Sequence, residues 1–83
     1  MIGCGEYDII EIVCMYQYPI TLTLRSGEII ECVAIDTKRN ETRDECVLVN
    51  IKHKTQLIIL DNIVQLAVNV DNPHIKRVVT FND

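Results

Sequence analysis

The spacing of apolar residues changes at Pro19, and this change restricts the chain to a helix followed by strands. Before the proline, apolar side chains recur at the helical period of about 100° per residue and gather on one face: Ile9, Ile10, Ile12, Val13 and Tyr16. The residue before a proline is pushed towards extended geometry, so we expect the helix to end there. Beyond it, Ile20, Leu22 and Leu24 alternate with polar residues, which predicts a half-buried strand.

Short apolar runs separated by turn residues continue to the end of the chain. They predict strands at residues 20–25, 28–36, 46–51, 55–60, 63–70 and 75–81. Residues 37–44 are polar throughout and are predicted as a loop or a long hairpin tip. One helix and five or six strands in 83 residues predict a mainly β fold. We expect a small, strongly bent antiparallel barrel or sandwich, forming a single domain over residues 1–83.

The helix face opposite the apolar one has an unusual composition, because it combines Tyr7, Asp8, Glu11 and Met15. Carboxylates flanked by an aromatic ring and a thioether suit a basic protein surface, whereas the phosphates of a nucleic acid would repel them. A second explanation remains open. Acids in the first turn, such as Glu6 and Asp8, stabilise a helix by lying near its unsatisfied N–H groups. Both explanations can hold at once.

Charge is divided unevenly along the chain, whose net charge is −4. Residues 1–36 carry six acidic side chains and one basic one, giving −5, whereas residues 37–83 carry six acidic and seven basic ones, giving +1. An acidic half of this kind favours a cationic protein partner over a nucleic acid.

The cysteines and histidines do not have the spacing of a metal site. They are Cys4, Cys14, Cys32, Cys46, His53 and His74. The N-terminal residues lack the basic region and the long apolar run of a signal peptide. We therefore expect free, buried thiols in the reducing cytoplasm, with no metal and no cofactor. No apolar run approaches the roughly 20 residues of a membrane span, so no membrane association is expected.

No catalytic constellation is recognisable, because the chain lacks a nucleophile motif, a phosphate-binding loop and metal-ligand spacing. His74 follows Asn72 and Pro73 and could act as a base, but a turn histidine more often packs or forms hydrogen bonds. Glu28 and Glu31 lie on opposite faces of their strand. We therefore expect that the protein is not an enzyme.

Residues 22–27 and 36–40 resemble the first motif of the Sm-like fold, also found in the bacterial RNA chaperone Hfq. The match consists of a strand, the turn glycine Gly27 and an Asp-x-x-x-Asn pattern at Asp36 and Asn40. The glycine-bearing second motif that helps to bind uridines is replaced by the sequence LDNI at residues 60–63. A small Sm-like RNA-binding protein is the alternative function. Its basic patch would be Lys38, Arg39, Arg43, Lys52, Lys54, Lys76 and Arg77, which can equally be an ordinary solubilising surface.

A closer resemblance is to the ROF family of Rho-binding antiterminators, which modulate Rho-dependent transcription termination in bacteria. The matching segments, in order, are residues 4–14, 22–28, 34–37, 60–63 and 72–74. This resemblance implies an Sm-like fold that works alone rather than in a ring. It also implies binding to the N-terminal RNA-binding domain of the hexameric termination factor Rho, with inhibition of termination as the result.

The resemblance also implies the contact surface, which lies on the N-terminal helix and the loop after the second strand. The matching residues are Tyr7, Asp8, Glu11, Lys38, Arg39 and Asn40. Because Rho holds single-stranded RNA, its primary site needs positive charge along a groove. Carboxylates placed where phosphates would lie can block RNA loading, so we expect no direct binding of nucleic acid. The closing strand at residues 75–81 is expected to cover one sheet edge and keep the protein a monomer.

Overall fold

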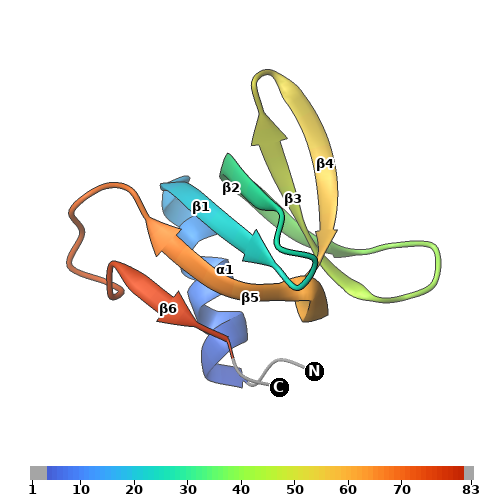
Figure 1. Ribbon diagram of the computed structural model, residues 1–83, viewed down its shortest axis with the longest axis horizontal. Helices are drawn as coiled ribbons and strands as arrows, with labels where there is room; N and C mark the ends of the chain where they lie inside the picture. The colour runs from blue at the N-terminus through green and yellow to red at the C-terminus, as the bar shows by residue number, and fades with distance from the viewer. Residues whose placement is uncertain (1–3, 82–83) are drawn as a thin grey trace.

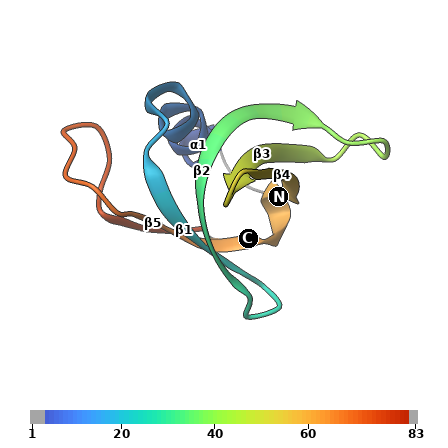
Figure 2. The same ribbon diagram turned by 90° about the horizontal axis from the view of Figure 1, so that it is seen from above.

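A computed structural model describes residues 4–81, and within that range it contains one α-helix, one 3-10 helix and six strands. In chain order they are α1 (Cys4–Tyr16), β1 (Pro19–Leu24), β2 (Ile29–Arg39), β3 (Glu45–Ile51), β4 (Lys54–Ile59), η1 (Leu60–Asn62), β5 (Ile63–Val68) and β6 (Val78–Thr80). The strands form one bent antiparallel sheet in the order β4-β3-β2-β1-β5-β6, with α1 packed against it (Figures 1 and 2). The predicted fold class is confirmed. The expectation about a signal peptide concerns residues 1–3, which lie outside this range.

The helix ends as the sequence predicts, just before Pro19. Gln17 adopts a left-handed backbone with φ of 51°, which stops the helix. The Tyr18 N–H then donates to the Val13 carbonyl at 3.2 Å and closes the last turn. Pro19 begins β1, so the helix and the first strand are joined by two residues only. None of the helices within residues 4–81 is long and apolar enough to cross a membrane.

The apolar face of α1 is confirmed at its centre and corrected at its end. Ile10 and Val13 are fully buried in the core. Tyr16 was expected on the same face, but its side chain is 47% exposed. Its ring stacks on His74 with centroids 4.4 Å apart and on Tyr18 with centroids 5.4 Å apart. Tyr16 therefore joins an exposed aromatic stack, and His74 has the packing role that is common for a turn histidine.

The core lies between α1 and the bent sheet, and it confirms the predicted alternation in the strands. Ile20 and Leu22 of β1 are buried, with the intervening Thr21 partly exposed. The other buried apolar side chains are Ile30, Cys32, Ala34, Cys46, Val47, Val49, Ile58, Leu60, Ile63, Leu66, Val68 and Phe81. A fully buried Val, Leu or Ile side chain stabilises the fold by about 1.5–3 kcal/mol. These contacts hold α1 in place against the sheet.

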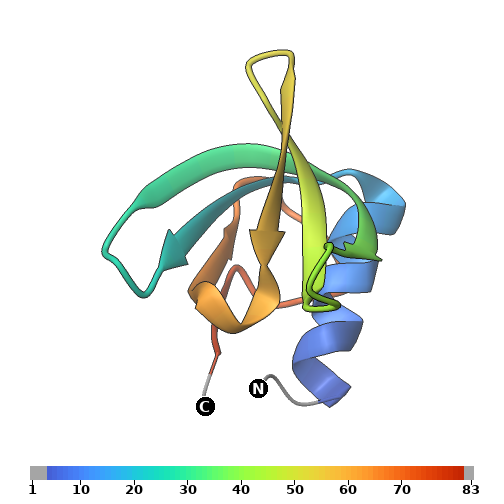
Figure 3. The same ribbon diagram turned by 90° about the vertical axis from the view of Figure 1, so that its right-hand side faces the viewer.

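The second strand is longer than predicted, because β2 continues through Thr37 and Lys38 to Arg39. The pairing of β2 with β3 shifts register between Ala34 and Asp36, as in a β-bulge. A bulge bends a strand and changes which side chains face the core, so a polar segment can remain paired. Figure 3 shows β2 curving across the molecule and ending beside α1. The predicted loop at residues 37–44 is therefore wrong in its first part, and the loop spans residues 40–44.

The last two strands are shorter than predicted, since β5 ends at Val68 and β6 covers only Val78–Thr80. The Asn72 Oδ1 accepts hydrogen bonds from the backbone N–H groups of His74 and Ile75, at 2.9 and 2.8 Å. These bonds hold the connection in a turn and occupy N–H groups that a strand would pair. The expected cover of a sheet edge is nevertheless present, because β6 pairs along β5 from Gln65 to Ala67.

Candidate protein-binding surface

Three exposed carboxylates lie on α1 and on the strand that packs against it, β2. Asp8 and Glu11 are three positions apart on the helix, so they share one face, and both are exposed. Asp36 of β2 is also exposed, and both Asp36 and Glu11 are close enough to Cys14 to raise the pKa of its thiol. We refer to Asp8, Glu11 and Asp36 as the acidic face. The sequence prediction did not include Asp36, because its proximity to the helix arises only from the packing of β2 against α1.

The pKa of the Cys14 thiol reflects its burial and the nearby carboxylates. Its pKa is raised from 9.0 to about 11, first by burial and then by the negative charges of Asp36 and Glu11. The thiol is therefore neutral at physiological pH, and it is a poor nucleophile and a poor metal ligand.

The other described thiols are inert for the same reason. Burial raises the pKa of Cys32 to about 11 and also raises that of Cys46. Both are free and buried, as predicted, whereas the side chain of Cys4 lies outside what the structure describes. Among the described residues, no group of three or more histidine, cysteine or acidic side chains could hold a metal ion.

Tyr7 differs from the other predicted contact residues on the helix because it is partly buried. Its ring packs against the core, and its hydroxyl donates a hydrogen bond to the Thr37 Oγ1 at 3.4 Å. This bond links the first half of α1 to the end of β2. Tyr7 therefore supports the acidic face from beneath and leaves only part of its ring accessible.

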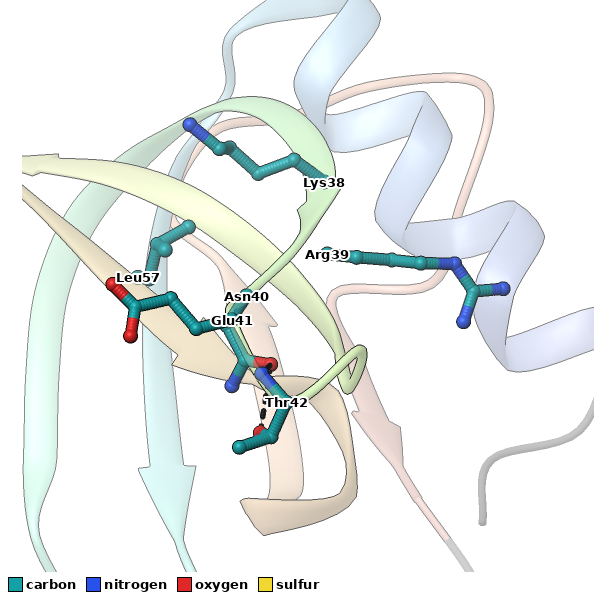
Figure 4. Close-up of a pocket in the computed structure, with 6 residues that line it drawn as sticks. All are labelled: Lys38, Arg39, Asn40, Glu41, Thr42 and Leu57. Atoms are coloured by element: carbon teal, nitrogen blue, oxygen red, sulfur yellow. Dashed lines mark hydrogen bonds between the residues drawn. The ribbon is translucent and has the colours of Figure 1, made fainter.

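The predicted basic pair after the second strand is separated by the pleat of β2. Arg39 extends towards α1, whereas Lys38 points away from it (Figure 4). The Arg39 guanidinium donates to the Arg43 carbonyl at 3.0 Å and lies 3.4 Å from a carboxylate oxygen of Glu45. Arg39 is thus tied to its own hairpin, while Lys38 is exposed on the opposite face of the strand.

Asn40 organises the loop that follows β2. Its Oδ1 accepts hydrogen bonds from the backbone N–H groups of Thr42 and Asp44, at 3.0 and 2.9 Å. Hydrogen bonds from Thr42 and then from Asn40 lower the pKa of Asp44. Asn40 therefore has a clear structural role, and its contact with a partner remains a prediction.

The sequence and the fold of the chain both match known proteins. Residues 1–80 match the family model described as modulator of Rho-dependent transcription termination (ROF). The chain belongs to the ROF family. A solved structure of YaeO bound to magnesium, from Vibrio cholerae O395, is 34% identical in sequence, with a TM-score of 0.85 over 92% of this chain and 97% of that chain. No curated protein sequence matches.

Membership of the ROF family confirms the resemblance that the ordered sequence segments indicate. The family is one of regulators that modulate termination by Rho. Within this ROF protein, the three predicted helix residues Tyr7, Asp8 and Glu11 lie together, with Asp36 beside them. The three residues predicted after the second strand line one open hollow, although the Lys38 and Arg39 side chains point in opposite directions and Asn40 also organises the loop.

Proposed function

We propose that this ROF protein inhibits termination by binding the N-terminal RNA-binding domain of Rho through the acidic face and blocking RNA loading. The observation that carries the proposal is the pair of exposed carboxylates Asp8 and Glu11 on one face of α1, with exposed Asp36 on the neighbouring strand β2. An RNA-binding groove must be cationic to hold phosphates. Fixed carboxylates can occupy such a groove in place of the phosphates.

The strength of the interaction would come from charge pairs that lose water at the interface. Removing one partner of such a pair commonly costs about 2–5 kcal/mol of binding free energy. Long-range attraction would also speed association, and salt would weaken it with a screening length of about 8 Å at physiological ionic strength.

The protein would act as a monomer in the cytoplasm, with residues 1–83 as a single Rho-binding domain. Support comes from β6, which covers the outer edge of β5 and leaves less free edge for joining subunits into a ring. Two of the basic side chains in the alternative RNA-binding patch are paired with carboxylates, Arg39 with Glu45 and Arg77 with Asp71. These two pairs reduce the positive charge that the patch could offer to RNA.

The test is a competition between this protein and a fluorescent single-stranded RNA bound to the Rho hexamer. We expect the protein to displace the RNA and to show no affinity for the RNA alone at low salt. Retention of RNA by Rho that is saturated with the protein would contradict the proposed mechanism. Direct RNA binding that falls steeply with salt would instead support the alternative function.

A further inference from the structure

The strand β4 leaves one sheet edge open. It pairs with β3 along one side, from Lys54 to Ile59, and within residues 4–81 no strand pairs with its other side. Its first four residues, Lys54 to Leu57, are exposed. An open edge presents unpaired N–H and C=O groups, which can hydrogen-bond to an added strand. The β3–β4 hairpin projects beyond the rest of the molecule, so this edge is accessible (Figure 3).

Basic side chains gather at the hairpin end of this edge. Lys52 and His53 form the β3–β4 turn and Lys54 begins β4, whereas Lys38 lies on β2, on the other side of β3. Within the described part of the chain, none of the three lysines has a carboxylate within 4.0 Å. The local positive charge is therefore not neutralised by ion pairs, although the whole protein is acidic.

The backbone of the turn shows that basic residues occupy positions where other residue types are preferred. Lys52 and His53 both have left-handed backbones, with φ of 49° and 73°. A two-residue turn with positive φ at both positions favours Asn and Gly. The Asn50 Oδ1 accepts a hydrogen bond from the His53 N–H at 3.0 Å and holds the turn in place. Two basic side chains thus occupy turn positions at which Asn and Gly are the favoured residues.

An open hollow of about 680 Å³ lies on one face of the sheet, between the end of β2 with its following loop and Leu57 of β4 (Figure 4). It is lined by Lys38, Arg39, Asn40, Glu41, Thr42 and Leu57. Leu57 is 38% exposed and offers an apolar contact on β4 itself. Lys38 and Glu41 carry opposite charges in this hollow, and Arg39 is paired with Glu45.

We propose that the open edge of β4 binds an acidic, extended segment of a partner protein, which adds a strand to the sheet. Main-chain hydrogen bonds would provide affinity, and alternate side chains would provide specificity. Carboxylates on one face of the added strand would lie near Lys54, and an apolar side chain on its other face would contact Leu57. A nucleic acid fits less well, because neither β4 nor the hollow carries an aromatic ring on which a base could stack.

A second copy of this chain also fits poorly. Pairing two β4 edges would bring two basic hairpins together, and like charges at an edge oppose such pairing. The outer edge of β5 is already occupied by β6. The proposed surface is basic and separate from the acidic face, so it can be tested without Rho.

The test uses an eight-residue peptide of alternating glutamate and valine, with blocked ends, added to the isotope-labelled protein. We expect NMR amide shifts centred on residues 52–59, with slower amide exchange in β4. Replacing the glutamates of the peptide by lysine should abolish binding. Lys54→Glu should weaken binding at least about tenfold. The matched control Lys76→Glu, at an exposed lysine outside this surface, should leave binding unchanged.

Three results of the peptide experiment would overturn the proposal. They are equal binding of the lysine peptide, shifts centred on other strands, and no binding at millimolar peptide. A dimer that forms through β4 in sedimentation experiments without peptide would assign the edge to a second copy and also overturn it. Asp8→Lys should leave peptide binding intact, which separates this surface from the one proposed for Rho.

Discussion

The hydroxyl of Tyr7 donates a hydrogen bond to the hydroxyl of Thr37, with 3.4 Å between the two oxygens. The two residues are 30 positions apart in the chain and belong to α1 and β2. The bond and the packing of the Tyr7 ring against the core fix the helix relative to the end of the strand. The backbone that carries Asp8 is consequently held beside the strand that carries Asp36.

Substitutions at Tyr7 should separate the contribution of its ring from that of its hydroxyl. Tyr7→Phe keeps the ring and removes one long hydrogen bond, so we expect a loss of about 0.5 kcal/mol in the free energy of unfolding. Tyr7→Ala also removes a partly buried ring and should cost about 2 kcal/mol. Urea unfolding measures both values. Equal losses for the two variants would show that the ring packing contributes nothing.

Charge reversal on the helix should abolish capture of Rho without affecting folding. Asp8→Lys and Glu11→Lys change exposed side chains, so thermal unfolding should be nearly unchanged. Binding to Rho, measured by calorimetry, should weaken by about 2–5 kcal/mol for each variant. The control is Glu28→Lys, an exposed acid in the β1–β2 turn, which lies far from α1 (Figure 2). A folded Asp8→Lys or Glu11→Lys variant that still inhibits fully would contradict the proposed site.

The free energy of unfolding should fall as the pH rises from about 9 to 11. The pKa values of Cys14 and Cys32 are raised from 9.0 to about 11 in the folded protein. The folded state therefore keeps protons that the unfolded state releases, which stabilises it below pH 9 and is lost as the pH passes through 11. Urea unfolding across this range measures the effect. Replacing both cysteines by alanine should reduce the slope, and an unchanged slope would assign it to other groups.

Removal of the Asn40 side chain should loosen the loop at residues 40–44. Asn40→Ala removes the acceptor for the N–H groups of Thr42 and Asp44, so the free energy of unfolding should fall by about 1 kcal/mol. The pKa of Asp44 should also rise towards its ordinary value, as measured by NMR titration. Glu41→Ala in the same loop is the control and should change neither property.

The protein should sediment as a monomer because β6 occupies the outer edge of β5. Val79→Pro removes a backbone N–H from β6 and should weaken its pairing with Leu66 of β5. We expect this variant to associate at concentrations at which the natural chain does not. A stable hexamer or heptamer of the natural chain would contradict the monomer proposal.

Local patterns are sufficient to predict the helix and the first strand. Ile10 and Val13 recur at the helical period, and Ile20 and Leu22 alternate, because each pair packs on a single continuous surface. Pro19 marks the boundary between the two periods through its own covalent geometry. The residues of the acidic face on α1 were predictable for the same reason.

Features that depend on distant contacts could not be predicted. The β-bulge near Asp36 lets a polar segment continue as a strand, so Thr37 looks like a loop residue from its sequence alone. Tyr16 fits the apolar period but stacks on His74, which only the folded chain brings near. The position of Asp36 beside the helix has the same origin. In each case the position of the residue depends on tertiary packing and does not follow from the local sequence pattern.

Burial of Ile10 and Val13 on the helix that displays Asp8 and Glu11 has a consequence for association. Negative charge on a disordered tail must be immobilised when it docks, and that ordering opposes complex formation. Here the backbone beneath the carboxylates is already fixed by the hydrophobic interior. Docking would therefore lose little chain entropy. A few fixed charges can then give the binding free energy for which a flexible polyanion needs many charges.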